Sequence, residues 1–526
     1  MVCTQNKIDS NVTGLSFAEE LCLGQLPYSV TPGDDLLSVW IPLDPNSYSN
    51  FGADVKTVAR NPINASRQNK KGVVTDLDVS GEFEQDLTKT NLTQLLQGFF
   101  FADAHEKPTN QPISGAASAK VTLANYTSAN QVNIASGDEV KFQVGHILKT
   151  SNNVVVANNQ NDVVVTATAA GVLTTAANTF AAESIVQNVN KLETVGYQFA
   201  AGIATLSVSG AMVKLVRSSG SFTTLGLNVG EWIFIGGDSA VFNFVTGSNK
   251  PGYARIKSIS ATELSLDQCT WVPVTDAGAA KTIRIYFGAF LRNEKNPSLI
   301  KRRTYTLERT LGSDADGEQS EYLIGSVPND FKLDVKAADK LMCNLSFVGQ
   351  NNDLRTGLEG KRPGNRTATI AQEDAFNTSS DIVQCRLFIV NSSVITPTSL
   401  FGFISEGTIE IKNGIKGNKA IGKLGSFEMS TGNFEVSGSL KLYFSTVLAV
   451  EAIKANADVS FNFISARQNY GFIYDIPLLG LGGGRIDVKK DDPIMLPVTN
   501  AAAENSWGYT IASVHFGYLP NIAMPV

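Results

Sequence analysis

The three histidines, His105, His146 and His515, are the residues best suited to general acid–base chemistry or to zinc ligation. Each lies in a different segment, and no cysteine, aspartate or glutamate stands at the spacing that a metal site or catalytic triad requires. The five cysteines are scattered and include no Cys-x-x-Cys pair, which predicts free thiols in a reducing compartment. We therefore expect no catalytic residue, no metal site and no cofactor.

Two further stretches begin like ligand-binding loops. Asp314-Ala315-Asp316-Gly317 starts a calcium-loop pattern, but the position that needs a bidentate glutamate is Gly325, so a turn is expected. Residues 479–485 (LGLGGGR) are glycine-rich but lack the strand-then-helix context of a phosphate loop, which favours a hairpin tip or a subunit-contact loop. Spacing alone leaves paired carboxylates for glycoside hydrolysis open, although the four tryptophans are too dispersed to form sugar platforms.

Composition narrows the function classes further. The chain has 526 residues, long enough for more than one domain, with 43% hydrophobic and only 17% charged residues. A formal net charge of -6 argues against static nucleic-acid binding, which needs clustered lysine and arginine. The one basic run, residues 301–303, is expected to be a solvated strand edge. No apolar stretch approaches the roughly 18 residues of a membrane helix, and residues 1–7 lack the apolar core of a secretion signal.

Long β-hairpins are the dominant pattern. In residues 330–349, Phe331, Leu333 and Val335 alternate with Lys332, Asp334 and Lys336, the two-residue period of a half-buried strand. Residues 406–445 and 73–84 alternate in the same way. In the latter, Val73, Thr75, Leu77, Val79 and Phe83 are expected to face inward, opposite a row of aspartates and glutamates.

Little helix is expected. Residues 91–101 are predicted to form a helix, with Asn91 as its N-cap. Residues 1–71 are rich in proline, asparagine and aspartate, which predicts an irregular arm without its own core and one short helix capped by Ser16 and Glu19.

The middle of the chain has a different texture, with few charges from residue 116 to residue 280. Residues 163–176 and 254–267 share a strand–turn–strand rhythm, and each follows a Val-Gly element. We read two small β modules, at about 118–200 and 201–280, inserted into a main domain formed by residues 1–115 and 281–526. The fold class predicted is all-β with minor α: a β-sandwich with one flanking helix and inserted β modules.

An ordered series of segments resembles the phage tail tube protein family, the major tail proteins of long-tailed bacteriophages. No single motif is specific; the order carries the resemblance. The segments of the main domain are residues 304–309, 322–329, 331–335, 345–349, 407–413, 420–422, 438–444, 482–488 and 517–520. In the inserted region, residues 220–222 and 229–232 are similar to a module that some tube proteins carry.

The resemblance implies a virion protein, assembled in the bacterial cytoplasm, whose hexameric rings stack into a hollow tail through which the genome is ejected. Closing six small sheets into a ring β-barrel leaves no free edge. Six copies would carry about 36 net negative charges, which repel DNA phosphates during transient passage. Implied partners are the chain itself, a tape measure protein, and tail terminator and baseplate proteins, with no membrane. Modules that project outward would crowd a contractile sheath, which favours a non-contractile tail.

The polar faces of the predicted hairpins are the candidate lining of the bore. An acidic row near residue 80 is the sharpest candidate, although a solvated outer surface also explains it. The candidate lumen-facing residues are Asp76, Asp78, Glu82, Glu84, Lys332, Asp334, Lys336, Glu410, Lys412 and Glu435. The alternative functions are a phage decoration or receptor-binding β protein and, third, a polysaccharide depolymerase, for which neither a β-solenoid repeat nor clustered carboxylates is visible.

Overall fold

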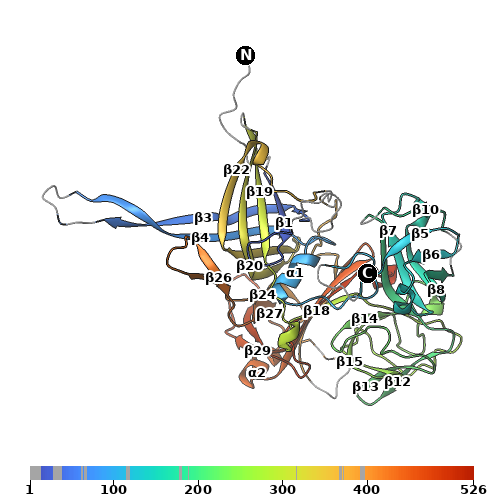
Figure 1. Ribbon diagram of the computed structural model, residues 1–526. Helices are drawn as coiled ribbons and strands as arrows, with labels where there is room; N and C mark the ends of the chain where they lie inside the picture. The colour runs from blue at the N-terminus through green and yellow to red at the C-terminus, as the bar shows by residue number, and fades with distance from the viewer. Residues whose placement is uncertain are drawn as a thin grey trace. The chain divides into compact units, whose positions relative to one another are not determined.

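The computed structural model describes residues 13–525, except for 28–37, 61–62, 64–67, 114–118, 177–179, 187–188, 315–316, 367–369, 371, 391–396 and 398. Antiparallel strands dominate the described residues, which confirms the all-β fold class (Figure 1). Two α-helices are present in them, α1 (Thr93–Phe100) and α2 (Leu448–Lys454). The sequence did not indicate α2, because seven residues are too few to show a helical period.

The chain forms two compact units. Unit 1 comprises residues 1–101, 301–376 and 406–440, and unit 2 comprises residues 102–300, 377–405 and 441–526. The units therefore change at Phe101/Ala102 and at Ile300/Lys301, close to both ends of the inserted region. The domain boundaries predicted from sequence stay a prediction.

Long antiparallel hairpins build unit 1. Its central sheet has the strand order β3–β4–β21–β20–β24–β27, and β20 continues past it to pair with β19 and β22. The strands with most of their length in unit 1 are β1 (Gly14–Glu19), β2 (Ile41–Leu43), β3 (Pro45–Arg60), β4 (Lys70–Asp86), β19 (Tyr305–Asp314), β20 (Gly317–Lys336), β21 (Met342–Gly349), β22 (Asn351–Thr356), β24 (Ile404–Lys412), β25 (Lys416–Lys419), β26 (Ser426–Ser430) and β27 (Glu435–Tyr443).

The N-terminal segment is not an irregular arm where it is described, and the short helix predicted there is wrong. Strand β1 pairs with β19 over its whole length and buries Leu15 and Phe17. Glu19 forms an ion pair with Arg303 instead of a capping box. The ladder of backbone hydrogen bonds and two buried side chains outweigh a local helix signal of a fraction of a kcal/mol per residue.

Helix α1 forms, but Asn91 is not its N-cap. The Asn91 side chain accepts a hydrogen bond from the backbone N–H of Thr88 and donates one to the carbonyl of Asp86, so it closes the preceding turn. The helix starts after Leu92 without a side-chain cap. It ends at Phe101, which adopts a left-handed backbone conformation with φ of 51°.

The distal half of the β3–β4 hairpin is exposed on both faces. Strand β21 pairs with β4 only from Val79 to Asp86, so residues 70–76 of β4 pair with β3 alone. Val73 is 53% exposed and Thr75 is also exposed, so their predicted inward orientation is wrong. Leu77, Val79 and Phe83 are buried as predicted.

Unit 2 contains a thirteen-stranded sheet with a mirrored strand order. Its two halves, β5–β6–β9–β8–β7–β11 and β12–β13–β16–β15–β14–β17, have the same order from rim to centre, and β11 joins β17 at the middle. Edge strand β10 extends the first half. The two stretches that look alike in sequence form equivalent hairpins, β8–β9 and β15–β16. The strands are β5 (Leu123–Tyr126), β6 (Gln131–Ile134), β7 (His146–Ser151), β8 (Gln160–Ala169), β9 (Val172–Thr175), β10 (Glu183–Ser184), β11 (Lys191–Gln198), β12 (Ala204–Ser209), β13 (Met212–Arg217), β14 (Trp232–Ile235), β15 (Gly252–Ile259), β16 (Glu263–Asp267) and β17 (Arg284–Tyr286).

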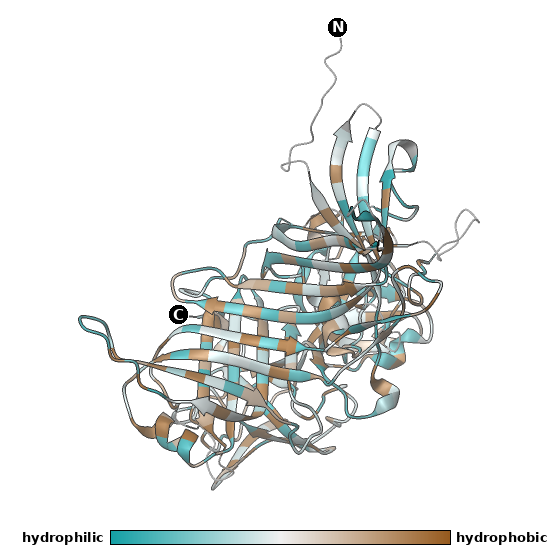
Figure 2. Ribbon diagram, turned by 90° about the vertical axis from the view of Figure 1, so that its left-hand side faces the viewer, coloured by the Kyte–Doolittle hydropathy of each residue, from teal (hydrophilic) through white to brown (hydrophobic). Residues whose placement is uncertain are grey.

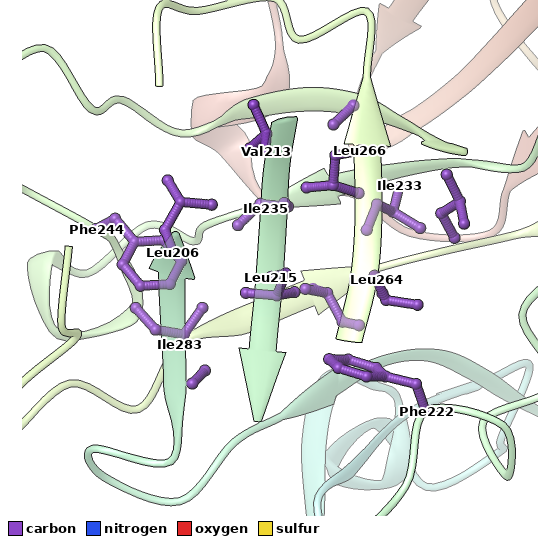
Figure 3. Close-up of a cluster of buried hydrophobic side chains, with 14 of the residues drawn as sticks. Leu206, Val213, Leu215, Phe222, Ile233, Ile235, Phe244, Leu264, Leu266 and Ile283 are labelled. Atoms are coloured by element: carbon purple, nitrogen blue, oxygen red, sulfur yellow. The ribbon is translucent and has the colours of Figure 1, made fainter. Parts of the chain in front are cut away.

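Each half of this sheet has its own apolar core. Figure 3 shows the second, in which Leu215, Ile233 and Leu264 meet from three strands and Phe222 lies at one end. The first half packs a separate cluster that includes Val132, Leu148 and Leu173. Apolar and polar bands alternate along the strands of the molecule (Figure 2), as half-buried sheets require.

The remaining strands of unit 2 are arranged about β29. They are β18 (Ala289–Arg292), β23 (Ile382–Ile389), β28 (Val459–Arg467), β29 (Tyr470–Gly483), β30 (Met495–Ala502) and β31 (Ala512–Phe516). Strand β29 pairs with β28, β30 and β31, while β23 pairs with β28 and β18 pairs with β31. Most of the glycine-rich stretch is strand and not a loop, because Leu479–Gly483 pairs residue by residue with β30. A Cβ at Gly482 would come within 2.8 Å of the Thr499 hydroxyl, so the neighbouring strand approaches closely there, whereas one at Gly480 would meet no atom within 4 Å.

Candidate functional site

The charged residues predicted from the hairpins gather on one face of the central sheet of unit 1. Strand register places Glu84, Asn344, Lys332 and Glu410 in one row across four adjacent strands. A second row contains Glu82, Ser346, Asp330 and Lys412. We call this surface, made by the outward residues of β4, β21, β20, β24 and β27, the charged face.

The opposite face of the same sheet fixes this orientation. Phe83, Leu345, Phe331 and Ile411 occupy consecutive strands in one row, and all four are buried. Helix α1 covers them, with the ring of Phe99 5.8 Å from that of Phe331. A slip of one residue in any of these strands would bury charges and expose aromatic rings, so the register is strongly determined.

The charged face is mixed in sign with an acidic excess. Of the ten predicted residues seven are carboxylates and three are lysines. The lysines lie beside carboxylates: Lys332 Nζ is 3.0 Å from Asp334, and Lys412 Nζ is 3.2 Å from Glu410. Lys336 lies opposite Glu406 across the β20–β24 ladder. Glu435 lies on β27 and is exposed.

Asp330 belongs to the same face and was missed from the sequence. Its carboxylate accepts hydrogen bonds from Asn329 and Ser346, and burial raises its pKa above the ordinary value. Asp86, which pairs with Lys340 at 2.8 Å, was missed as well. Both residues continue the alternation of their strands, so extending the period by one step would have found them.

Asp76 and Asp78 lie on the same face of β4, but beyond the part that β21 covers. Lys419, from the small β25–β26 hairpin, binds both carboxylates, at 2.8 Å and 2.9 Å. Lys56 of β3 also pairs with Asp78. The hydrogen bond from Lys419 lowers the pKa of Asp76, and those from Lys56 and Lys419 lower that of Asp78. This part of the acidic row is therefore largely neutralised by lysines.

The histidines lie apart from one another in structural roles. His105 Nε2 is 2.8 Å from Glu294 Oε1, and His515 is buried with its ring 3.0 Å from the Ser513 hydroxyl. Burial lowers the pKa of His146 to about 4 and that of His515 to about 3. The described residues include no cluster of three or more potential metal ligands. Asp314 and Gly317 pair in the β19–β20 ladder, and the two central residues of the predicted turn, 315 and 316, lie outside the described residues.

Among the described residues, no helix is both long and apolar enough to cross a membrane. A search of curated proteins finds no match to the chain. The family model described as phage tail tube protein matches residues 10–502. That match includes the charged face, the inserted modules and most of both units. The chain therefore belongs to the phage tail tube protein family, and it is a structural component of the virion tail.

Proposed function

We propose that this protein is the repeating subunit of the tail tube, that it closes into rings around a bore, and that stacked rings conduct the genome during ejection. One observation carries the proposal: a single sheet that is aromatic and helix-covered on one side and predominantly acidic on the other. A wall facing a passing polyanion needs such a surface, because clustered cations would hold the phosphates. No catalysis is required for this role.

Ring closure follows from the edges of that sheet. Within the described residues, β3 has β4 as its only ladder partner, so its outer backbone groups are available. An exposed strand of 16 residues invites pairing with another chain. In a ring each sheet pairs with the next, which satisfies these groups and forms a continuous barrel around the bore with six sheet positions.

The partners in this proposal are further copies of the chain, the tape measure protein inside the growing tube, and terminator and baseplate proteins at its ends. Assembly takes place in the cytoplasm of the bacterial host. The inserted modules of unit 2 lie outside the bore, which favours a non-contractile tail. DNA passes transiently, without specific binding.

Electron microscopy of the purified protein tests the proposal. We expect hollow filaments of uniform diameter above a threshold concentration. A variant with Phe331→Asp, which places a charge under helix α1, should give no filaments, whereas Lys332→Ser on the opposite face should assemble. Wild-type protein that stays monomeric at high concentration and instead binds capsids or host cells would favour the decoration or receptor-binding alternative.

A further inference from the structure

The order of elements along the chain repeats. Strand β1 is followed by the β3–β4 hairpin, helix α1, and strands β19, β20, β21 and β22. Strand β23 is followed by the β24–β27 hairpin, helix α2, and strands β28, β29, β30 and β31. Each series contains one strand, one hairpin, one short helix and four strands. The additions are the short strand β2 between β1 and β3, the small β25–β26 hairpin between β24 and β27, and residues 102–300 after α1, which carry the inserted modules and β18.

The strand pairings repeat as well. In unit 1, β20 pairs with β19 and β22 through its first half and with β21 through its second half, and β19 pairs with β1. In unit 2, β29 pairs with β28 and β31 through its first half and with β30 through its second half, and β28 pairs with β23. The long strand changes partners midway in both.

The registers of the two series agree at one constant spacing. Strand β21 runs from Met342 to Gly349 and β30 from Met495 to Ala502, so both ends are 153 residues apart. The Asp334↔Met342 pair corresponds to the Asp487↔Met495 bridge at the same spacing. The turn between these strands has a left-handed residue in each series, Ala338 with φ of 58° and Asp491 with φ of 66°, again 153 residues apart.

The amino-acid sequence repeats at this spacing too. Residues 332–336 read Lys-Leu-Asp-Val-Lys, and residues 485–489 read Arg-Ile-Asp-Val-Lys. Hairpins recur in any all-β protein, but a shared spacing for a sequence motif, a bridge, a left-handed turn and both ends of a strand indicates duplication of one tube fold.

The inserted modules are consistent with this duplication. Backbone N–H of Lys301 donates to the carbonyl of Phe101 at 2.7 Å, so the chain leaves and re-enters unit 1 at neighbouring points between α1 and β19. In the second copy, α2 ends at Lys454 and β28 starts at Val459, without an insertion. Removing residues 102–300 therefore leaves two copies of similar length and connection.

We propose that each chain carries two tandem tube folds, so that three chains, and not six, fill the six sheet positions of a ring. This inference rests on the proposed tube function. The joint between the two copies of one chain is visible inside unit 1: β20 of the first copy pairs with β24 of the second from Asp330↔Lys412 to Lys336↔Glu406. Because β24 occupies in the second copy the place of β3 in the first, the joint between chains pairs residues 483–489 with β3 of a neighbouring chain.

Exposure supports this second joint. Leu333 and Val335 of the first copy are 0% and 9% exposed, whereas their counterparts Ile486 and Val488 are 40% and 68% exposed. Asp487 exchanges backbone hydrogen bonds with Met495, so in an antiparallel arrangement the N–H groups of Ile486 and Val488 point to the opposite, open edge. The neighbouring chain's β3 would cover that edge.

Cryo-electron microscopy of assembled tubes decides the question through the symmetry of the ring. We expect three-fold symmetry, three chains of 56.2 kDa per ring and six similar sheets around the bore. Tubes with six chains per ring would overturn this inference and leave the proposed function standing. Failure of the wild-type protein to form any tube would instead contradict the proposed function.

A substitution tests the joint between chains independently. Val488→Pro removes an N–H from the open edge and leaves the Asp487–Met495 bridge intact, so we expect folded protein that does not close rings. The matched control Val488→Thr keeps the N–H and should assemble. Normal tubes from the proline variant would refute the joint. Circular dichroism tests whether the proline variant folds. If the variant does not fold, the ring symmetry of the wild-type tubes decides whether three chains or six form a ring.

Discussion

Removing Arg255 should strongly destabilise unit 2. Its guanidinium forms a bidentate contact with Asp267, at 2.9 Å and 3.1 Å, and donates to Asp475 at 3.0 Å. The side chains of Arg255 and Asp475 are 5% and 1% exposed. Replacing Arg255 with leucine keeps much of the apolar volume but leaves the Asp475 carboxylate buried without its cation. Breaking a buried pair in this way costs about 3–5 kcal/mol.

The loss should depend on pH in a defined direction. Burial raises the pKa of Asp475 above its ordinary value, and Arg255 opposes that rise. Without Arg255 the folded-state pKa rises further, so the folded protein holds a proton that the unfolded chain releases above about pH 4. Stability of the variant therefore falls as pH rises from the unfolded-state pKa to the folded-state pKa, and the defect should be larger at pH 8 than at pH 5.

Urea unfolding followed by tryptophan fluorescence measures both effects. Trp507 is a local probe, because the Arg255 guanidinium lies 4.9 Å from the centre of its ring. Asp267→Asn is the matched control: the side chain of Asp267 is 22% exposed and Asp475 keeps its cation, so about 1 kcal/mol or less should be lost. A defect of Arg255→Leu below about 1 kcal/mol, or equal at pH 5 and pH 8, would refute the reasoning.

Three further predictions follow from the cores and the charged face. Phe99→Ala should destabilise unit 1 by about 3–5 kcal/mol in chemical denaturation. Phe403→Ala, which removes a side chain that is 78% exposed, should change stability by under about 0.5 kcal/mol in the same measurement. Equal effects of the two substitutions would contradict the assigned core. His515→Gln should reduce the loss of stability between pH 6 and pH 4 by roughly 2–3 kcal/mol, because the buried histidine, with a pKa of about 3, stays neutral while the unfolded chain takes up a proton below about pH 6.5. Thermal melts across this pH range measure the difference, and an unchanged dependence of stability on pH would count against a neutral His515. Changing both Asp76 and Asp78 to lysine should slow DNA ejection at low salt but not at high salt, because the change adds cations beside Lys56 and Lys419. An ejection rate that is unchanged at low salt would place this part of β4 away from the bore.

Strand periodicity predicted much of the charged face. The alternation around Phe331 and Leu333 fixes which side of β20 is buried, and the structure places the predicted charges on the other side. The ion pairs were not predictable, because Lys419 meets Asp76 and Asp78 only through the fold. Local signals failed where ladder pairing outweighed them, as in β1, where a capping pattern lies within a strand.

The duplication has a weak but readable sequence signal. The motifs at 332–336 and 485–489 share three identical and two conservatively exchanged residues. Five residues alone do not establish a repeat. The pairing of β20 and β29 with equivalent partners is what gives the motif its meaning, and that pairing is long-range information.

The orientation of the charged face in an assembled tube is the most direct test of the central claim. A reconstruction that resolves strands should place Lys332, Glu410 and Glu84 on the wall of the bore, with helix α1 behind them and the inserted modules outside. A tube in which these three side chains face the outer surface, or in which the modules line the bore, would contradict the account.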